Sequence, residues 1–330
     1  MENIFTDTDL VDLLNFTLTC PEAKELPKFL SPHIDHLYIV HHWYTEMYYI
    51  AWETGKVFFR VDDRYYNEHF VTSGTTRILR NVSIGYNTMR GTLDDQAAIF
   101  HEIVCKSNED QEKAFRNVVE LVLKMTTPTS RIELHSGGPK KDNFFYMFDI
   151  VKKFHKLHIL LPKDMTDDDL QFILENSCIE DLRIGGACED LEYHGATKST
   201  EFRVRDGIWL TGECLLNIES QQFYVEGTCF TGMDIKQFLE NWKRGESSSN
   251  MTKMSISKNA KTRIRNYNSV LVRGFDAERW HAPFVFNDAS CLSLKPEFTW
   301  CMRNVNDDLG MVEITPNTIK FVAWSSDELS

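Results

Sequence analysis

The sequence predicts a mixed α/β fold, an irregular leucine-rich-repeat-like solenoid of strand–helix units with an N-terminal β-hairpin region and a C-terminal antiparallel β-hairpin. Three observations support this prediction. Short apolar-x-apolar segments recur through the middle of the chain, most of them follow a stretch with helical periodicity, and alternating apolar residues flank a turn near each end. The chain has 330 residues, of which 42% are hydrophobic, enough for a substantial buried core.

The N-terminal third predicts a hairpin followed by a helix. Apolar residues alternate along Met47–Ala51 and again along Val57–Val61. Between them lies Glu53–Lys56, in which Gly55 can adopt the positive φ that a tight turn requires. Apolar residues at helical spacing then predict a helix near Gln111–Met125.

The middle third repeats a short strand pattern. Its members are Ile132–Leu134, Leu157–Ile159, Leu182–Ile184, Ile208–Leu210, Phe223–Val225 and Met254–Ile256. A strand–helix unit of roughly 25 residues cannot bury its apolar face alone, whereas stacked parallel units bury a continuous core. We therefore expect the strands at Leu157, Leu182 and Ile208 to be successive and parallel in one sheet. The asparagine ladder of regular repeats is missing, and an α/β sheet with chance regularity is the alternative.

Candidate helices separate these strands at Asn143–Phe154, at Leu170–Leu174 and at Ile235–Trp242. Two of them have recognisable starts. Thr166 is followed by three aspartates, and Thr231 is followed after three residues by Asp234, which suits a capping box. The apolar stripe of the candidate helix that follows Thr231 consists of Ile235, Phe238, Leu239 and Trp242. The Trp242 ring is therefore predicted to face the core.

The last third departs from this pattern. Met311–Thr315 and Thr318–Trp324 flank Pro316-Asn317, which predicts a closing antiparallel hairpin. Such a hairpin would cap a solenoid. The most loop-like segment is Arg244–Asn250, with three consecutive serines.

Charge and patterning exclude several classes of partner. Asp and Glu outnumber Lys and Arg by 49 to 36, a net charge of −13 that disfavours nucleic acid. No run of 18 apolar residues predicts a membrane span. The first residues lack the basic region and apolar core of a signal peptide, so we expect a cytoplasmic or nuclear protein.

No combination of residues predicts catalysis, a cofactor or a metal site. His101-Glu102 begins like a zinc-protease motif but lacks its second histidine, and the eight cysteines form no CxxC pair. Four histidines cluster at His33, His36, His41 and His42 without carboxylates or thiols at ligand spacing. We therefore predict that the chain is not an enzyme and uses no cofactor.

Three segments together resemble the nematode F-box-associated family, type 2. They are Asp206–Thr211, Leu215–Ile218 and Thr231–Gly245, which are similar in order to that family's strand and capped-helix motifs. The chain end, at Val312–Ile314 and Phe321–Trp324, is also similar. The likeness covers about residues 110–325. Its motif residues Asp234, Phe238, Leu239 and Trp242 are structural in their chemistry.

The resemblance implies a substrate receptor of an SCF-type ubiquitin ligase, in which an F-box binds a Skp-type adaptor and cullin and the rest holds a target. Asp9–Leu18 is similar to the second half of an F-box. We expect the first helix to be missing and Pro21 to interrupt the helix after Leu18, so adaptor binding should be weak or absent. The remnant's candidate adaptor contacts, which we expect to be helical with Leu14 and Leu18 largely buried against the chain, are Leu10, Leu13, Leu14, Phe16 and Leu18.

The resulting hypothesis is a non-catalytic protein-interaction protein that recognises a ligase substrate. The alternative is a free-standing solenoid interaction module that no longer binds the adaptor, and an enzyme with an unrecognised site is a third possibility. The expected regions are an F-box remnant at 1–35, a hairpin and helix at 36–126, the repeat-like solenoid at 127–260 and a C-terminal capping region at 261–330.

Overall fold

A computed structural model describes the central and C-terminal parts of the chain most completely. The described residues are 36–42, 47–52, 57–62, 77–83, 99–104, 116, 119–120, 122–123, 131–137, 142–151, 154–176, 179–186, 191–246, 250–257, 277–280 and 294–325. The chain divides into two compact units, Met1–Lys156 and Leu157–Ser330, which are described separately.

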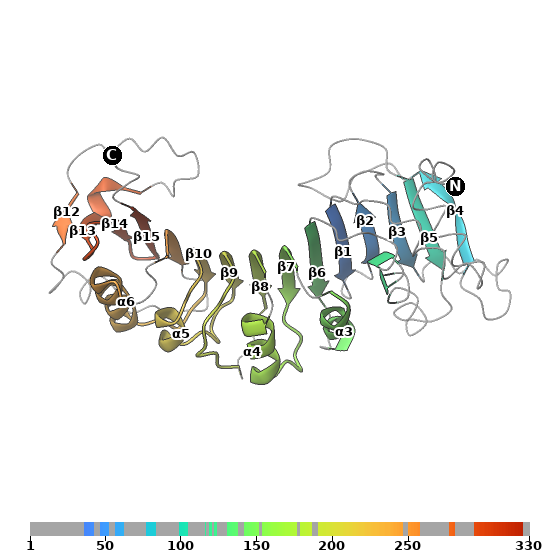
Figure 1. Ribbon diagram of the computed structural model, residues 1–330, viewed down its shortest axis with the longest axis horizontal. Helices are drawn as coiled ribbons and strands as arrows, with labels where there is room; N and C mark the ends of the chain where they lie inside the picture. The colour runs from blue at the N-terminus through green and yellow to red at the C-terminus, as the bar shows by residue number, and fades with distance from the viewer. Residues whose placement is uncertain are drawn as a thin grey trace. The chain divides into compact units, whose positions relative to one another are not determined.

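The first unit contains a mixed sheet (Figure 1). Its strands are β1 (His36–His42), β2 (Met47–Trp52), β3 (Val57–Asp62), β4 (Arg77–Ser83), β5 (Ile99–Val104) and β6 (Arg131–Gly137), in the order β6, β1, β2, β3, β5, β4. β2 and β3 pair antiparallel, so the predicted N-terminal hairpin is confirmed. β1 pairs with β6 in parallel, and Leu37, Ile39 and Leu134 on these strands are fully buried.

Two helical predictions fall in this unit. Within Gln111–Met125 the structure describes five residues, all helical, of which Val119 and Val122 are fully buried. The helix expected over Asn143–Phe154 is α3 (Asp142–Ile150) and ends earlier than predicted. Phe154 nevertheless lies in the core, four residues beyond the end of the helix.

The second unit alternates strands and helices before ending in antiparallel strands. Its elements are β7 (Lys156–Leu160), α4 (Asp167–Asn176), β8 (Asp181–Gly185), β9 (Glu201–Arg205), α5 (Gly212–Leu216), β10 (Gln222–Glu226), α6 (Gly232–Arg244), β11 (Lys253–Ser257), β12 (Glu278–Arg279), η4 (Pro296–Phe298), β13 (Thr299–Arg303), β14 (Leu309–Ile314) and β15 (Thr318–Trp324). The strand order is β7, β8, β9, β10, β11, β15, β14, β13, β12.

Strands β8 to β11 pair in parallel, while β15 pairs antiparallel with both β11 and β14. The C-terminal antiparallel hairpin is therefore confirmed, and β13 extends it. The mixed α/β class is also confirmed, and the sheet is open rather than closed into a barrel.

One predicted strand is wrong. Ile208–Leu210 is not a strand, and β9 (Glu201–Arg205) occupies the third place after β7 and β8. The chain leaves the sheet at Asp206, whose φ of 61° starts a turn. Trp209 then fills the core, and Leu210 makes only an isolated bridge with Tyr193. An apolar-x-apolar triplet supports a core-filling loop as well as a strand, which explains the error.

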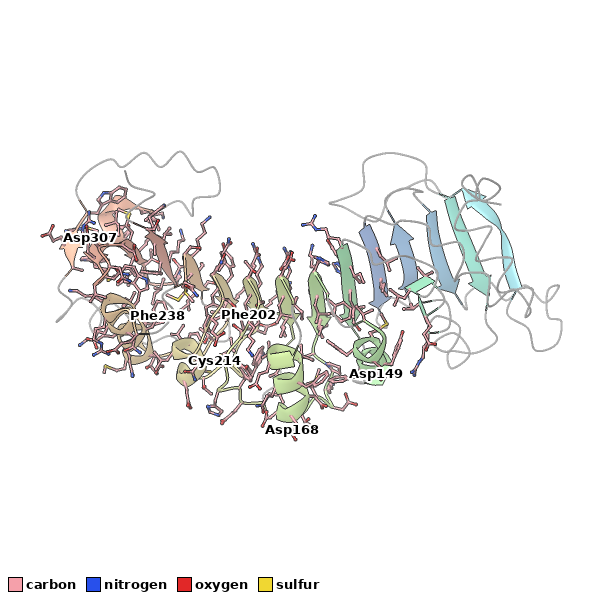
Figure 2. All side chains as sticks on the ribbon, viewed as in Figure 1. Asp149, Asp168, Phe202, Cys214, Phe238 and Asp307 are labelled. Atoms are coloured by element: carbon pink, nitrogen blue, oxygen red, sulfur yellow. The ribbon has the colours of Figure 1, made fainter. Side chains whose placement is uncertain are left out.

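Helices α4, α5 and α6 lie on one side of the strands of this unit (Figure 1). The burial pattern of the strands supports this arrangement. In β7, β10 and β11 half-buried or exposed residues alternate with fully buried ones, so one face of each strand lies in the core. The inward residues form aromatic contacts across strands, such as Phe202 with Phe223 at a centroid distance of 5.7 Å. Phe202 and Phe238, both labelled in Figure 2, belong to this core.

Two helices begin with the side chain–backbone exchange that the sequence predicts. The Thr166 backbone N–H donates to Asp169 Oδ2 (3.0 Å) and the Asp169 N–H to Thr166 Oγ1 (3.2 Å). At α6, Thr231 and Asp234 make the same pair of bonds, a complete capping box. These bonds satisfy amide donors that the first helical turn leaves without partners.

Candidate interaction surface

Outward-facing residues repeat a polar pattern on three successive strands. β8 carries Asp181 and Arg183, β9 carries Glu201 and Arg203, and β10 carries Gln222 and Tyr224, each pair two residues apart. Residues two apart on a strand share a face. The apolar residues between and after them point to the buried side. Alternation along each strand therefore places the polar side chains on the outer face and the apolar ones in the core.

The strand register aligns these pairs. Asp181 lies opposite Glu201 and Arg183 opposite Arg203, while Glu201 lies opposite Gln222 and Arg203 opposite Tyr224. The third positions continue through Ser255 on β11 to Lys320 on β15. We call this line the outer row; it consists of Arg183, Arg203, Tyr224, Ser255 and Lys320.

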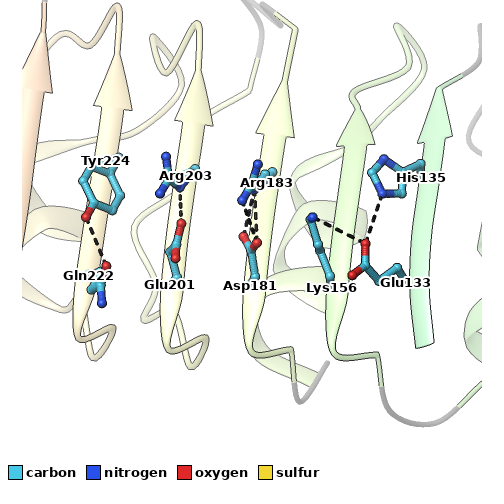
Figure 3. A network of polar contacts seen from close by, with 9 residues as sticks. All are labelled: Glu133, His135, Lys156, Asp181, Arg183, Glu201, Arg203, Gln222 and Tyr224. Atoms are coloured by element: carbon cyan, nitrogen blue, oxygen red, sulfur yellow. Dashed lines mark hydrogen bonds and ion pairs between the residues drawn. The ribbon is translucent and has the colours of Figure 1, made fainter. Parts of the chain in front are cut away.

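Each of the first three strands pairs its two outward side chains with each other (Figure 3). Arg183 donates to Asp181 through Nε (3.0 Å to Oδ1) and Nη2 (2.8 Å to Oδ2), a bidentate contact. Arg203 donates to Glu201 from Nε. The Tyr224 hydroxyl donates to Gln222 Oε1 at 3.0 Å.

A ring contact joins two neighbouring strands along the outer row. The guanidinium carbon of Arg203 lies 4.4 Å from the centroid of the Tyr224 ring, within the range of a cation–π interaction. Burial raises the pKa of the Tyr224 phenol, with Glu201 adding to this effect and Arg203 opposing it. The phenol therefore stays neutral and keeps its hydrogen-bond donor at physiological pH.

At its far end the outer row meets a buried carboxylate. Lys320 Nζ lies 3.1 Å from Glu313 Oε1, and the Glu313 side chain is 1% exposed. The same carboxylate accepts a hydrogen bond from the backbone N–H of Lys295. The carboxylate of this ion pair therefore lies beneath the segment that precedes β13.

The first unit has a related polar cluster at its last strand. Glu133 Oε2 lies 3.4 Å from Lys156 Nζ and 3.6 Å from His135 Nε2, as Figure 3 shows. Glu133 and His135 are two residues apart on β6, so the spacing matches that of the second unit.

The titratable groups buried beneath the sheet have the properties of core residues. Burial raises the pKa of the Cys214 thiol to about 12, so this cysteine is protonated and unreactive at neutral pH. Burial, together with Cys214 and Glu175, also raises the pKa of Tyr193, whose hydroxyl donates to the Ala196 carbonyl.

The described residues contain no group of three His, Cys, Asp or Glu side chains placed to hold a metal ion. Within the described ranges, no helix is long and apolar enough to cross a membrane. Of the clustered histidines, His36, His41 and His42 lie on β1, and His33 lies outside the described residues.

The motif residues of the resemblance lie in one helix. Asp234 closes the capping box of α6, and Phe238, Leu239 and Trp242 are buried, with the Trp242 ring 1% exposed. The predicted inward position of Trp242 is thus confirmed. The candidate adaptor contacts lie outside the described residues; they are Leu10, Leu13, Leu14, Phe16 and Leu18.

The outer row was not predicted as a surface from the sequence. Its signal is present in the chain, since an acidic or amide residue precedes Arg183, Arg203 and Tyr224 by two positions. What the sequence does not contain is the register that aligns the three strands.

Comparison with known families gives one match. Residues 195–256 match the family model described as F-box associated, which covers β9, α5, β10, α6 and most of β11. This confirms the resemblance found in the sequence over that segment. No curated protein and no solved structure matches the chain significantly.

Proposed function

We propose that this chain, whose residues 195–256 match the F-box associated family, is a non-catalytic substrate-recognition protein related to the receptors of SCF-type ubiquitin ligases. The family match carries the proposal, because F-box-associated regions serve F-box proteins as the part that binds a target protein. The described residues support it, since their charged side chains form ion pairs and caps rather than a convergent catalytic set.

The proposal includes a leucine-rich-repeat-like arrangement of the middle of the chain. Parallel pairing of β8 to β11, with α5 and α6 between the later strands, supports it. In such an arrangement one sheet face stays open to a partner. We retain the regions 1–35, 36–126, 127–260 and 261–330 as the proposed division and the cytoplasm or nucleus as the proposed location.

The proposed partners are a target protein and, through the N-terminal segment, a Skp-type adaptor and its cullin. Pro21 favours the alternative of a free-standing module, because proline removes an amide donor and obstructs a helix continuing through that position. Calorimetric titration of the purified chain with the adaptor separates the two. A nanomolar dissociation constant supports the receptor, and no detectable heat supports the free-standing module.

Affinity purification of the tagged full chain, followed by mass spectrometry, tests the function as a whole. We expect at least one enriched target protein. A Leu13→Ala/Phe16→Ala variant should keep that target while losing any adaptor and cullin, because the proposed adaptor contacts are separate from the target-binding region. If no protein is enriched above an untagged control, the proposed function is wrong.

A further inference from the structure

We infer that the outer row docks an acidic, extended segment of a protein partner. This inference deepens the proposed function and rests on it, since it assigns the surface and the chemistry by which a target would be held. Three properties of the row support it: its alignment, the exposure of its bases and their fixed orientation.

The outer row crosses five neighbouring strands. Each step from Arg183 through Arg203, Tyr224 and Ser255 to Lys320 is a direct register pair. Four steps of about 4.8 Å put the backbones of Arg183 and Lys320 roughly 19 Å apart. An extended segment of roughly six residues spans that distance.

The row contains three bases, and the next register position beyond Lys320 is the buried Glu313, in a chain whose net charge is −13. In each ion pair the base is the more exposed partner. Arg183 is 39% exposed against 22% for Asp181, Arg203 is 44% against 23% for Glu201, and Lys320 is 20% against 1% for Glu313. A partner approaching this face therefore meets more of the cationic side chains than of the carboxylates.

The less exposed carboxylates also orient the bases. Asp181 holds the Arg183 guanidinium through two donors, and Arg203 is fixed between Glu201 and the Tyr224 ring. Side chains ordered before binding lose less conformational entropy when a ligand arrives. Guanidinium groups form charge-assisted hydrogen bonds with carboxylates, so this chemistry suits the acidic side chains of a partner.

The rest of the open face argues for a protein segment over a nucleic acid. Glu226 is exposed on the same face opposite Arg205, and the neighbouring row consists of Asp181, Glu201, Gln222 and Lys253. Closely spaced phosphates would meet these carboxylates as well as the bases, whereas an extended peptide can place its acidic side chains at intervals. The overall negative charge acts in the same direction.

Fluorescence anisotropy with a labelled polyglutamate peptide of about ten residues tests the inference, since that length covers the row with overhang. A polyglutamine peptide of equal length is the control for charge. We expect saturable binding of the glutamate peptide to the full chain that weakens as salt rises. Equal binding of the two peptides, or no binding of the glutamate peptide, would overturn the inference.

Matched variants locate the binding. Arg183→Gln/Arg203→Gln neutralises two bases of the row, and Lys243→Gln/Arg244→Gln neutralises two bases at the end of α6, on the helix side. The first should weaken peptide binding by about tenfold or more, as expected for losing two charge-assisted contacts, and the second should change it little. Equal loss in both variants, or tighter binding of single-stranded RNA than of the peptide, counts against the inference.

Circular dichroism and thermal unfolding show whether each variant is folded, and Arg183→Lys/Arg203→Lys provides a version that keeps the charge. This variant should retain part of the binding. Repeating the affinity purification with the Gln variant separates the two proposals. A target retained by that variant refutes the inference but leaves the proposed function intact, whereas no target with the unmodified chain refutes the proposed function.

Discussion

The parallel strands β8 to β11 and β14 of the antiparallel region share one helix-covered face but differ on the other. In β9 and β10 buried residues alternate with half-buried or exposed ones, whereas all six residues of β14 are buried. Chemically similar ion pairs therefore have different surroundings. Glu201 is partly exposed on the parallel part, and Glu313 is almost fully buried on the antiparallel part.

The outer face of β14 is covered by the segment before β13. Its Lys295 backbone N–H donates to Glu313, and the buried Thr299 hydroxyl donates back to the Lys295 carbonyl at 2.8 Å. The sequence of β14, Leu-Gly-Met-Val-Glu-Ile, is nearly continuous in apolar residues, as expected for a strand buried on both faces. The comparison shows that the open face of β8 to β11 results from strict alternation of polar and apolar residues.

The largest effect should come from the face that the two regions share. Trp242 packs against Phe321 of β15 at a centroid distance of 5.1 Å, and Trp242→Ala should lower the free energy of unfolding by roughly 3–5 kcal/mol. Urea unfolding measures this. Met233→Ala on the same helix is the control, because Met233 is 61% exposed and its loss should change little. Equal stabilities of the two variants would contradict the core position of Trp242.

The next largest effect tests the difference between the two outer faces. Glu313→Ala leaves Lys320 and the Lys295 amide without their buried acceptor and should cost roughly 2–4 kcal/mol. Glu201→Ala removes a partly exposed partner and should cost about 0–1 kcal/mol. Chemical denaturation of both variants checks the contrast. Similar losses of stability in the two variants would mean that covering Glu313 with the segment before β13 has no energetic effect.

A smaller effect is expected at the start of α6, which supplies core residues to both regions. Thr231→Ala removes the acceptor for the Asp234 amide and should cost about 1 kcal/mol. Thr231→Ser keeps the hydroxyl and should cost clearly less. Thermal unfolding of the two variants compares them. If Thr231→Ser is destabilised as much as Thr231→Ala, the cap is not the source of the loss.

The smallest effect on stability at neutral pH is expected from the titration of Cys214, which is buried beneath the parallel strands. Because burial raises its pKa to about 12, the folded state retains a proton that the unfolded thiol, with an ordinary pKa of 9.0, releases earlier. Its contribution to stability is therefore complete below about pH 9 and is lost as pH rises toward 12. Unfolding measured from pH 7 to 11 should show a shallower decline for Cys214→Ala than for the unmodified chain. Identical slopes would show that this thiol does not titrate differently on folding.

The sequence predicted those features that depend on neighbouring residues. The hairpins at Met47–Trp52 and Thr318–Trp324 and the capped start at Thr231 result from local alternation and capping chemistry. The strand expected at Ile208–Leu210 was wrong because a short apolar triplet does not reveal that Asp206 turns the chain out of the sheet. β9 was missed because its charged residues hide a similar Phe202-x-Val204 alternation.

The candidate surface was less accessible to sequence analysis than the core. Arg183 and Arg203 lie 20 residues apart in the sequence, each two residues after an acid, a pattern that by itself indicates only a surface ion pair. Their alignment depends on the pairing of strands about 20 residues apart, which tertiary packing decides. Residues distant in the sequence form a row only once the register is known.

The strand β12 forms a short edge of the sheet in the second unit. It has only two residues, Glu278 and Arg279, both exposed, and it lies at the end of the strand order in the second unit. A long apolar strand at that position would offer a row of backbone donors and acceptors to another copy and could seed ordered aggregates. A short charged strand offers few backbone groups to pair with, so self-association through this edge is disfavoured.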